Sequence, residues 1–235
     1  MRTVKLLVAA SLLSTGASVW SKEKAPSLLS SADLDPRLVL PVPPAKDSLQ
    51  AANELLELKT VQRRRTPAAV AAAKWDSDAK SAAIFTEVLG PIFDLDRLPA
   101  TKHLFDLVRA TEKDVADRGK DEFKRARPWI VDPSIKSCSR SDEPLSSYPS
   151  GHTTMAYSMG AVLARLVPDK ASAIMARAAR YGESRIVCEQ HFRSDVTAGE
   201  VLGMLVAERL MTKPEFVAAF DAAKAELRAV NLSRE

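Results

Sequence analysis

The sequence predicts an all-α fold, a single-domain helical bundle of roughly seven to nine helices. Apolar residues recur at helical spacing through most of the chain, and no segment shows the sustained alternation of apolar and polar residues that indicates a strand. The 235 residues include only eight glycines, several segments are rich in alanine, and the connections between helical patterns are short. With 46% hydrophobic residues, a chain of this length can build one sizeable core.

The N-terminus has the layout of a secretory signal peptide, which we assign to residues 1–21. Arg2 and Lys5 precede an apolar run from Leu6 to Trp20, after which charged residues return. An ordinary buried helix is the alternative, but it does not account for the basic residues ahead of the run. No later apolar stretch reaches the roughly 20 residues that a membrane span needs. We therefore expect export to the periplasm through a cleaved signal peptide, without a membrane anchor.

The helices are expected to begin after an irregular lead. Residues 22–46 are rich in proline and have few periodic apolar positions, which predicts an extended N-terminal arm rather than a packed element. Residues 47–235 are assigned to one all-α domain. Leu49 and Leu55 keep helical spacing in its first helix, and Pro67 lies in the first turn of the second. Further helical patterns run over about 78–89, 99–118, 152–166, 169–183, 191–211 and 214–229.

The last pattern shows how such a helix packs. Phe216, Phe220, Ala223 and Leu227 form an apolar stripe behind Pro214, with charged residues on the other faces. This stripe is expected to belong to the core rather than to a cofactor site.

Charge argues against a nucleic-acid partner. The formal net charge is +4 for the whole chain, and it falls to about +2 without the two basic residues of the signal peptide. The only basic run, Arg63 to Arg65, is predicted to be a solvated helix end rather than a binding patch.

Cys138 and Cys188 are the only cysteines, and an even count in an exported protein predicts one disulfide. Closing a loop of about 50 residues would stabilise the fold by roughly 4 kcal/mol on the chain-entropy model. A reactive cysteine is the alternative, although neither residue has the sequence neighbourhood of a nucleophile.

Three short polar clusters carry the chemistry of the chain. They supply three fixed cations, one carboxylate and two of the three histidines in the chain. The third histidine, His103, is expected to be surface or core. The clusters read Lys120-x6-Arg127-Pro128, Pro149-Ser150-Gly151-His152 and Ser184-Arg185-x5-His191-x3-Asp195. Together they supply what is needed to hold a phosphate group and to attack it.

The third cluster predicts a nucleophile. If a helix begins near His191, then Asp195 lies four residues on along the same face, and its carboxylate can bond a ring nitrogen. The other nitrogen is then a neutral nucleophile, and the carboxylate stabilises the charge that grows on the ring. Arg185 is predicted to bind the phosphate. The alternative is a histidine that is simply hydrogen-bonded on a helix face.

The other two clusters predict an anion site and an acid. Ser150 is a good helix N-cap, Gly151 lets the backbone approach a ligand closely, and the free N–H groups of a helix N-terminus bind phosphate oxygens. His152, which opens this helix, is the predicted general acid for the leaving alkoxide. Lys120 and Arg127 are two helical turns apart and can face one pocket. Taken singly, the second cluster could be a plain helix cap and the first a solvated surface.

The order and spacing of the three clusters resemble the signature of the type 2 phosphatidic acid phosphatase (PAP2) superfamily, above all that of secreted bacterial class A non-specific acid phosphatases. The likeness covers about residues 100–212, whereas residues 22–98 carry no matching motif. It implies a helical bundle of the PAP2 and vanadium haloperoxidase type. It also implies a metal-independent phosphomonoesterase with an acidic pH optimum and no cofactor, which agrees with the lack of any convincing metal-ligand spacing in the sequence.

The resemblance also implies a role for each matching residue. His191 would form a phosphohistidine, Asp195 would orient it, and His152 would protonate the departing alcohol. The phosphoryl oxygens would be bound by Lys120, Arg127, Ser150, the Gly151 N–H and Arg185. Phosphate monoesters of broad specificity and inorganic phosphate would be the ligands, and the intermediate would also pass its phosphoryl group to alcohols. Class A relatives are often homodimers, so the resemblance weakly favours a homodimer, and the oligomeric state stays open.

Three other functions fit parts of the same pattern. Vanadium haloperoxidases share the clusters but usually have much longer chains. Lipid phosphatases of the superfamily span the membrane, which this chain is not expected to do. A phosphate-binding protein without activity would not need both histidines together with Asp195.

Overall fold

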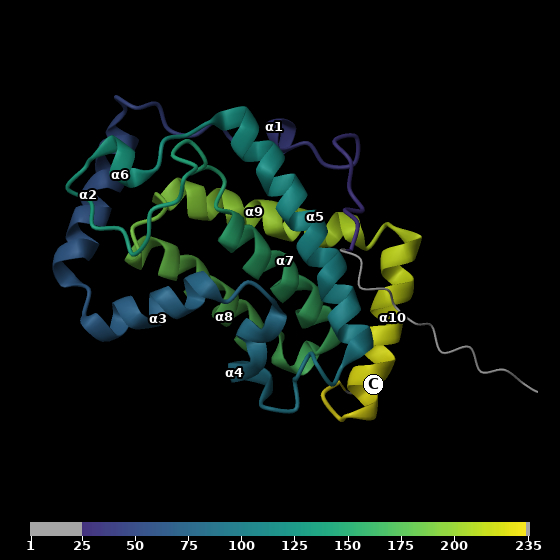
Figure 1. The fold of residues 1–235 in the computed structure, drawn as a ribbon. Coiled ribbons are helices and arrows are strands. Elements are labelled where there is room, and N and C mark those ends of the chain that lie inside the picture. The colour runs from purple at the N-terminus through teal and green to yellow at the C-terminus, as the bar shows by residue number, and fades with distance from the viewer. Residues whose placement is uncertain (1–24, 234–235) are drawn as a thin grey trace, which may run out of the picture.

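The computed structural model describes residues 25–233, and its fold within them is all-α, without strands (Figure 1). The fold class predicted from the sequence is therefore confirmed. The predicted signal peptide, residues 1–21, lies outside the described part of the chain. No helix between residues 25 and 233 is both long and apolar enough to cross a membrane.

The helices follow the predicted patterns closely. The longer ones are α2 (Leu49–Arg64), α3 (Pro67–Asp78), α5 (Pro99–Phe123), α7 (Gly151–Leu166), α8 (Ala171–Val187), α9 (Arg193–Leu210) and α10 (Pro214–Ala229). Single turns form α1 (Pro36–Val39), α4 (Thr86–Leu89) and α6 (Pro128–Val131), with 3₁₀ turns at Ala82–Phe85 and Pro168–Lys170. Proline occupies the first turn of α3, α5 and α10, where its missing N–H costs nothing.

Two predicted helices differ from the structure. The pattern over 78–89 is not one helix, because Ser81 caps a separate 3₁₀ turn with its hydroxyl and α4 follows as a single turn. The pattern over 191–211 begins later than expected, at Arg193, so His191 precedes α9 instead of lying on it. The second difference changes how the site is built.

Helix α7 lies at the centre of the bundle and packs against α5, α8 and α9 (Figure 1). Two glycines allow α9 to approach α7 closely. A Cβ at Gly199 would lie 2.7 Å from the carbonyl oxygen of Ser150, and one at Gly203 would lie 2.6 Å from that of Thr154. Side chains larger than hydrogen are therefore excluded at both positions, and the close contact brings the start of α9 to the N-terminus of α7.

The N-terminal arm is packed, contrary to the prediction. Its described part is irregular apart from α1, yet Leu29, Leu34 and Leu40 are buried in the main core. Tyr148 donates a hydrogen bond to the carbonyl of Pro41, at 2.6 Å. The proline-rich sequence prevents a long helix, but it does not prevent its leucines from covering apolar surface.

The predicted disulfide between Cys138 and Cys188 is present, with a Cα–Cα distance of 4.9 Å. It ties the loop after α6 to the segment just before His191. The prediction of a solvated end for α2 fails at Arg65, which donates to the carbonyl of Val187 at 2.7 Å and pairs with Glu189. Arg65 therefore fastens α2 to the disulfide-linked segment.

Candidate active site

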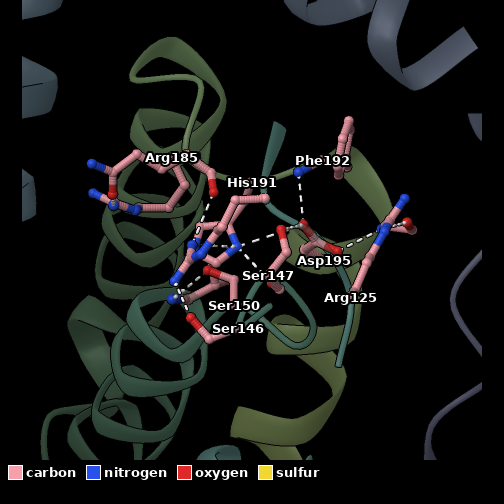
Figure 2. A network of polar contacts seen from close by, with 12 residues as sticks. Arg125, Ser146, Ser147, Ser150, Arg185, His191, Phe192 and Asp195 are labelled. Carbon is pink, nitrogen blue, oxygen red and sulfur yellow. Dashed lines mark hydrogen bonds and ion pairs between the residues drawn. The ribbon is translucent and has the colours of Figure 1, made fainter. Parts of the chain in front are cut away.

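The structure brings the three predicted clusters together at the N-terminus of α7 (Figure 2). Arg127, from the first cluster, places Nη1 2.8 Å from Nε2 of His191 in the third. The second cluster joins them where the Ser150 N–H donates to the carbonyl of Asp195, at 2.9 Å. Lys120 lies beside Gly151, since a Cβ there would be 3.2 Å from the lysine nitrogen.

His191 is held with one nitrogen available for reaction. The side chain is only 1% exposed, and Nδ1 lies 2.7 Å from the carbonyl oxygen of Ser147. A carbonyl oxygen can only accept, so Nδ1 carries the proton and Nε2 of the neutral ring keeps its lone pair. Burial, followed by the charge of Arg127, lowers the pKa of His191 well below its ordinary value. The neutral form of the ring is therefore favoured.

The predicted hydrogen bond between His191 and Asp195 does not form. Nδ1 of His191 and Oδ2 of Asp195 are 3.6 Å apart, which is an ionic contact but not a hydrogen bond. Because α9 begins at Arg193, Oδ2 of Asp195 instead accepts from the Phe192 N–H at 2.8 Å and from the Ser147 hydroxyl at 2.6 Å. Asp195 thus acts on His191 through Ser147, whose carbonyl holds the ring.

Arg125 supports Asp195 from the other side, and its part was not predicted. Nη1 of Arg125 lies 2.5 Å from Oδ1 of Asp195, and Nη2 lies 2.7 Å from a carboxylate oxygen of Glu54 (Figure 2). Its guanidinium also lies over the ring of Phe192, 4.4 Å from the centroid. Burial raises the pKa of Asp195, while Arg125 opposes this shift. In the sequence Arg125 looks like one of several surface cations, and only its place beside Arg127 sets it apart.

Two buried guanidinium groups act on His191: Nη1 of Arg127 lies 2.8 Å from Nε2, and the charges of both Arg127 and Arg185 lower the pKa of the ring. Arg127 donates to the carbonyl of Gln190 at 2.9 Å and to the hydroxyl of Ser146 at 3.0 Å. Arg185 is fully buried and donates to the side-chain oxygen of Gln190. Burial lowers the pKa of each arginine to about 10, so both stay charged at neutral and acidic pH.

These guanidinium groups have donors to spare. Nε of Arg127, and Nε and Nη1 of Arg185, are buried without a hydrogen-bond partner among residues 25–233. An unsatisfied buried donor is costly, and more so on a charged group. Buried cationic donors without a protein partner suit a multiply bonded anion such as a phosphoryl group.

His152 is held through one of its ring nitrogens. Nε2 lies 3.0 Å from the carbonyl oxygen of Ser77, at the C-terminal end of α3, so Nε2 carries the proton and Nδ1 is the titrating atom. The ring stacks on Tyr181, with 6.1 Å between centroids. Burial, followed by the charge of Arg185, lowers the pKa of His152 well below its ordinary value.

Ser184, also part of the third cluster, acts at a distance from the anion site. Its hydroxyl donates to Asp76 at 2.6 Å, and Asp76 also pairs with the buried Arg177. These contacts fix the end of α3, from which the Ser77 carbonyl holds His152. The third histidine, His103, lies near the start of α5 and takes part in none of these contacts.

The remaining predicted ligands lie at the N-terminus of α7 and on the part of α5 beside it. Ser150 caps α7, and its hydroxyl oxygen accepts from Thr153, which leaves the hydroxyl proton to donate. Lys120 pairs with Asp117 at 2.8 Å. Beside Lys120, Gly151 and His152 lies a cavity of about 180 Å³. Within the described chain, no group of three or more His, Cys, Asp or Glu residues is arranged to hold a metal ion.

Comparison with known proteins agrees with the sequence resemblance. The sequence profile described as PAP2 superfamily matches residues 110–216. The chain is 31% identical over 233 residues to an acid phosphatase from Zymomonas mobilis, covering 96% of this chain and 88% of that protein. It is 28% identical over 220 residues to a non-specific acid phosphatase from Providencia stuartii, covering 90% of this chain and 88% of that protein.

Solved structures of membrane enzymes share the fold. The structure of a transmembrane PAP2 type phosphatidylglycerolphosphate phosphatase from Bacillus subtilis superimposes with a TM-score of 0.54 at 18% identity, covering 69% of this chain and 85% of that chain. Aquifex aeolicus LpxE also gives a TM-score of 0.54, at 20% identity, covering 71% of this chain and 96% of that chain. At these identities the likeness concerns the fold alone.

Proposed function

The chain belongs to the PAP2 superfamily, and on that basis we propose that it is an exported acid phosphatase that hydrolyses phosphate monoesters through a phosphohistidine on His191. The observation that carries the proposal is the set of buried, unpartnered guanidinium donors of Arg127 and Arg185 around a neutral histidine. Buried positive charges beside a neutral nucleophile suit an enzyme whose nucleophile attacks a phosphorus atom.

In the first half of the reaction, Nε2 of His191 attacks the phosphorus atom as the bond from phosphorus to the alcohol oxygen breaks. The departing alkoxide takes the proton from Nδ1 of His152, so a neutral alcohol leaves. The proton on Nδ1 of His191 stays hydrogen-bonded to Ser147 and delocalises the charge that develops on the ring. Asp195, which accepts from the Ser147 hydroxyl, stabilises that charge from a short distance.

The phosphoryl oxygens are bound by Arg127, Arg185 and Lys120, together with the Ser150 hydroxyl and the Gly151 N–H. The last donor lies at the N-terminus of the 16-residue helix α7, where the helix dipole also favours an anion. Three fixed cations supply the charge that divalent metal ions supply in other phosphoryl-transfer enzymes. Metal independence is therefore part of the proposal.

In the second half, Nδ1 of His152 accepts a proton from water as the water oxygen attacks phosphorus. The bond from phosphorus to Nε2 breaks, and inorganic phosphate leaves. An alcohol in place of water would yield a new monoester, so transfer to alcohols is expected as a side activity. Because these groups bind the phosphoryl part and not the alcohol, we expect broad specificity.

An acidic pH optimum follows from the two histidines. Burial and Arg185 lower the pKa of His152, so the protonated acid that the first half-reaction needs becomes abundant only as the pH falls. The reaction also needs a neutral His191, and the lowered pKa of this ring favours its neutral form. Export to the periplasm is supported by the predicted signal peptide and by the disulfide, which needs an oxidising compartment.

The proposal is tested by hydrolysis of para-nitrophenyl phosphate by the mature protein from about pH 4 to 8, with and without EDTA. We expect turnover that peaks below neutrality, resists EDTA and is lost in His191→Ala. A His103→Ala variant is the matched control and should retain the wild-type rate. Turnover that EDTA abolishes, or that survives in His191→Ala, would contradict the proposal.

A further inference from the structure

A cavity lies beside His152, the proposed general acid, and the leaving alcohol has to come close to that residue if the proposed function holds. One face of α5 lines it through Arg109, Glu112, Asp117 and Lys120, which recur at helical spacing. Gly151 and His152 at the start of α7 also line it, as does Lys80. Its volume of about 180 Å³ equals that of about six water molecules, which suits a small polar leaving group.

The lining of this cavity carries more positive charge than its acidic residues offset. Asp117 accepts salt bridges from both Lys113 and Lys120, so their charges offset one another in part. Lys80 makes no ion pair or hydrogen bond with residues 25–233 that the structure records, although its charge acts on His152. Glu143 is the other acidic residue in the lining, and it is exposed to solvent.

Arg109 is the second cation of the lining whose charge is not fully offset by a carboxylate. It pairs with Glu112, which is fully buried and has one carboxylate oxygen without a partner in the described part of the chain. Burial raises the pKa of Glu112 to about 7. At the acidic pH of the proposed reaction Glu112 is therefore neutral, and the positive charge of Arg109 faces the cavity without a counter-ion.

We propose that this cavity is a subsite for an anionic group on the leaving alcohol, with Lys80 and Arg109 as its contacts, and that the preferred substrates are small phosphate monoesters of hydroxy acids. The inference rests on the proposed function, because the alcohol enters this cavity only if the phosphoryl group is bound at His191. A carboxylate two or three bonds from the ester oxygen would lie between these two cations and His152.

A matched pair of substrates tests the subsite. D-3-Phosphoglycerate and sn-glycerol 1-phosphate differ only in that the first has a carboxylate where the second has a hydroxymethyl group. We expect a higher kcat/KM for the first in the wild-type protein, and a preference that weakens as salt is raised from about 0.05 to 0.5 M. The substitution Lys80→Gln should lower kcat/KM for phosphoglycerate about 2- to 5-fold and leave glycerol phosphate within about 1.5-fold, as one exposed ion pair predicts.

The substitution Lys102→Gln is the control. Lys102 is an exposed lysine of α5, pairs with Asp106 and does not line this cavity, so its loss changes the net charge equally. Equal loss for both substrates in Lys80→Gln, an equal loss in Lys102→Gln, or a wild-type preference for glycerol phosphate would overturn the subsite. Failure of the proposed function is distinct, since the wild-type protein would then hydrolyse neither substrate nor para-nitrophenyl phosphate.

Discussion

The substitution Arg125→Met tests whether the support behind Asp195 is built as described. Arg125 is the partner of two buried carboxylates, those of Asp195 and Glu54. Methionine keeps much of the side-chain volume but leaves both carboxylates without their cation. Removing one partner of a buried ion pair costs about 3 to 5 kcal/mol, because the remaining charge is stranded in a poor solvent. We expect the free energy of unfolding to fall by about this amount at pH 8.

The loss should depend on pH in a defined direction. Burial raises the pKa of Asp195 above its ordinary value even with Arg125 present. A carboxyl group with a raised pKa in the folded state is most favourable when protonated, so its contribution to stability declines as the pH rises. Without Arg125 the pKa rises further. The difference between variant and wild type should therefore be smaller at pH 5 than at pH 8.

Urea unfolding followed by circular dichroism at both pH values measures this difference. The control is Arg193→Met, because Arg193 also pairs with two carboxylates, those of Glu57 and Glu183, but its side chain is 36% exposed. Exposed pairs are worth about 0 to 1 kcal/mol. A loss in Arg125→Met no larger than in this control, or one equal at both pH values, would refute the reasoning.

Three further results are expected. The pKa of Glu112 is raised from an ordinary 4.5 to about 7. As the pH rises from 5 to 8, the free energy of unfolding of Glu112→Gln should therefore increase by about 2 kcal/mol relative to that of the wild type. A difference between the two proteins that does not change with pH would count against this. Replacing Cys138 and Cys188 by serine removes a cross-link between residues 50 positions apart. The free energy of unfolding in urea should fall by about 4 kcal/mol, and a fall under about 1 kcal/mol would contradict this prediction. His152→Ala should slow hydrolysis of an alkyl phosphate far more than that of para-nitrophenyl phosphate, whose leaving group needs no acid; equal slowing would exclude that role.

Local patterns in the sequence predicted most of the fold. Helical spacing and first-turn prolines such as Pro67 and Pro214 depend only on neighbouring residues, and the structure places helices there. The arm over residues 22–46 was predicted to be unpacked because its leucines do not recur at helical or strand spacing. Their burial depends on apolar surface supplied by distant helices, which no local pattern reveals.

The meeting of the three clusters also rests on patterns that can be recognised in the sequence. The clusters that meet around His191 are recognisable because each has a fixed internal spacing. The hydrogen bond from His191 goes to Ser147 and not to Asp195 because α9 starts two residues later than the spacing suggests. The role of Arg125 depends on a contact 70 residues away in sequence. Such contacts follow from the packing of α9 against α7 and cannot be deduced from spacing within one segment.

The most direct test of the central claim is to trap the intermediate on His191. Wild-type protein and the His191→Ala variant are mixed with phosphate-labelled monoester, quenched in alkali within the first turnovers and digested for peptide mass analysis. We expect one phosphoryl group per chain on the peptide that contains His191, stable in alkali, released by acid and absent from the variant. A wild-type protein that turns over substrate without this label, or that carries it on another residue, would contradict the account.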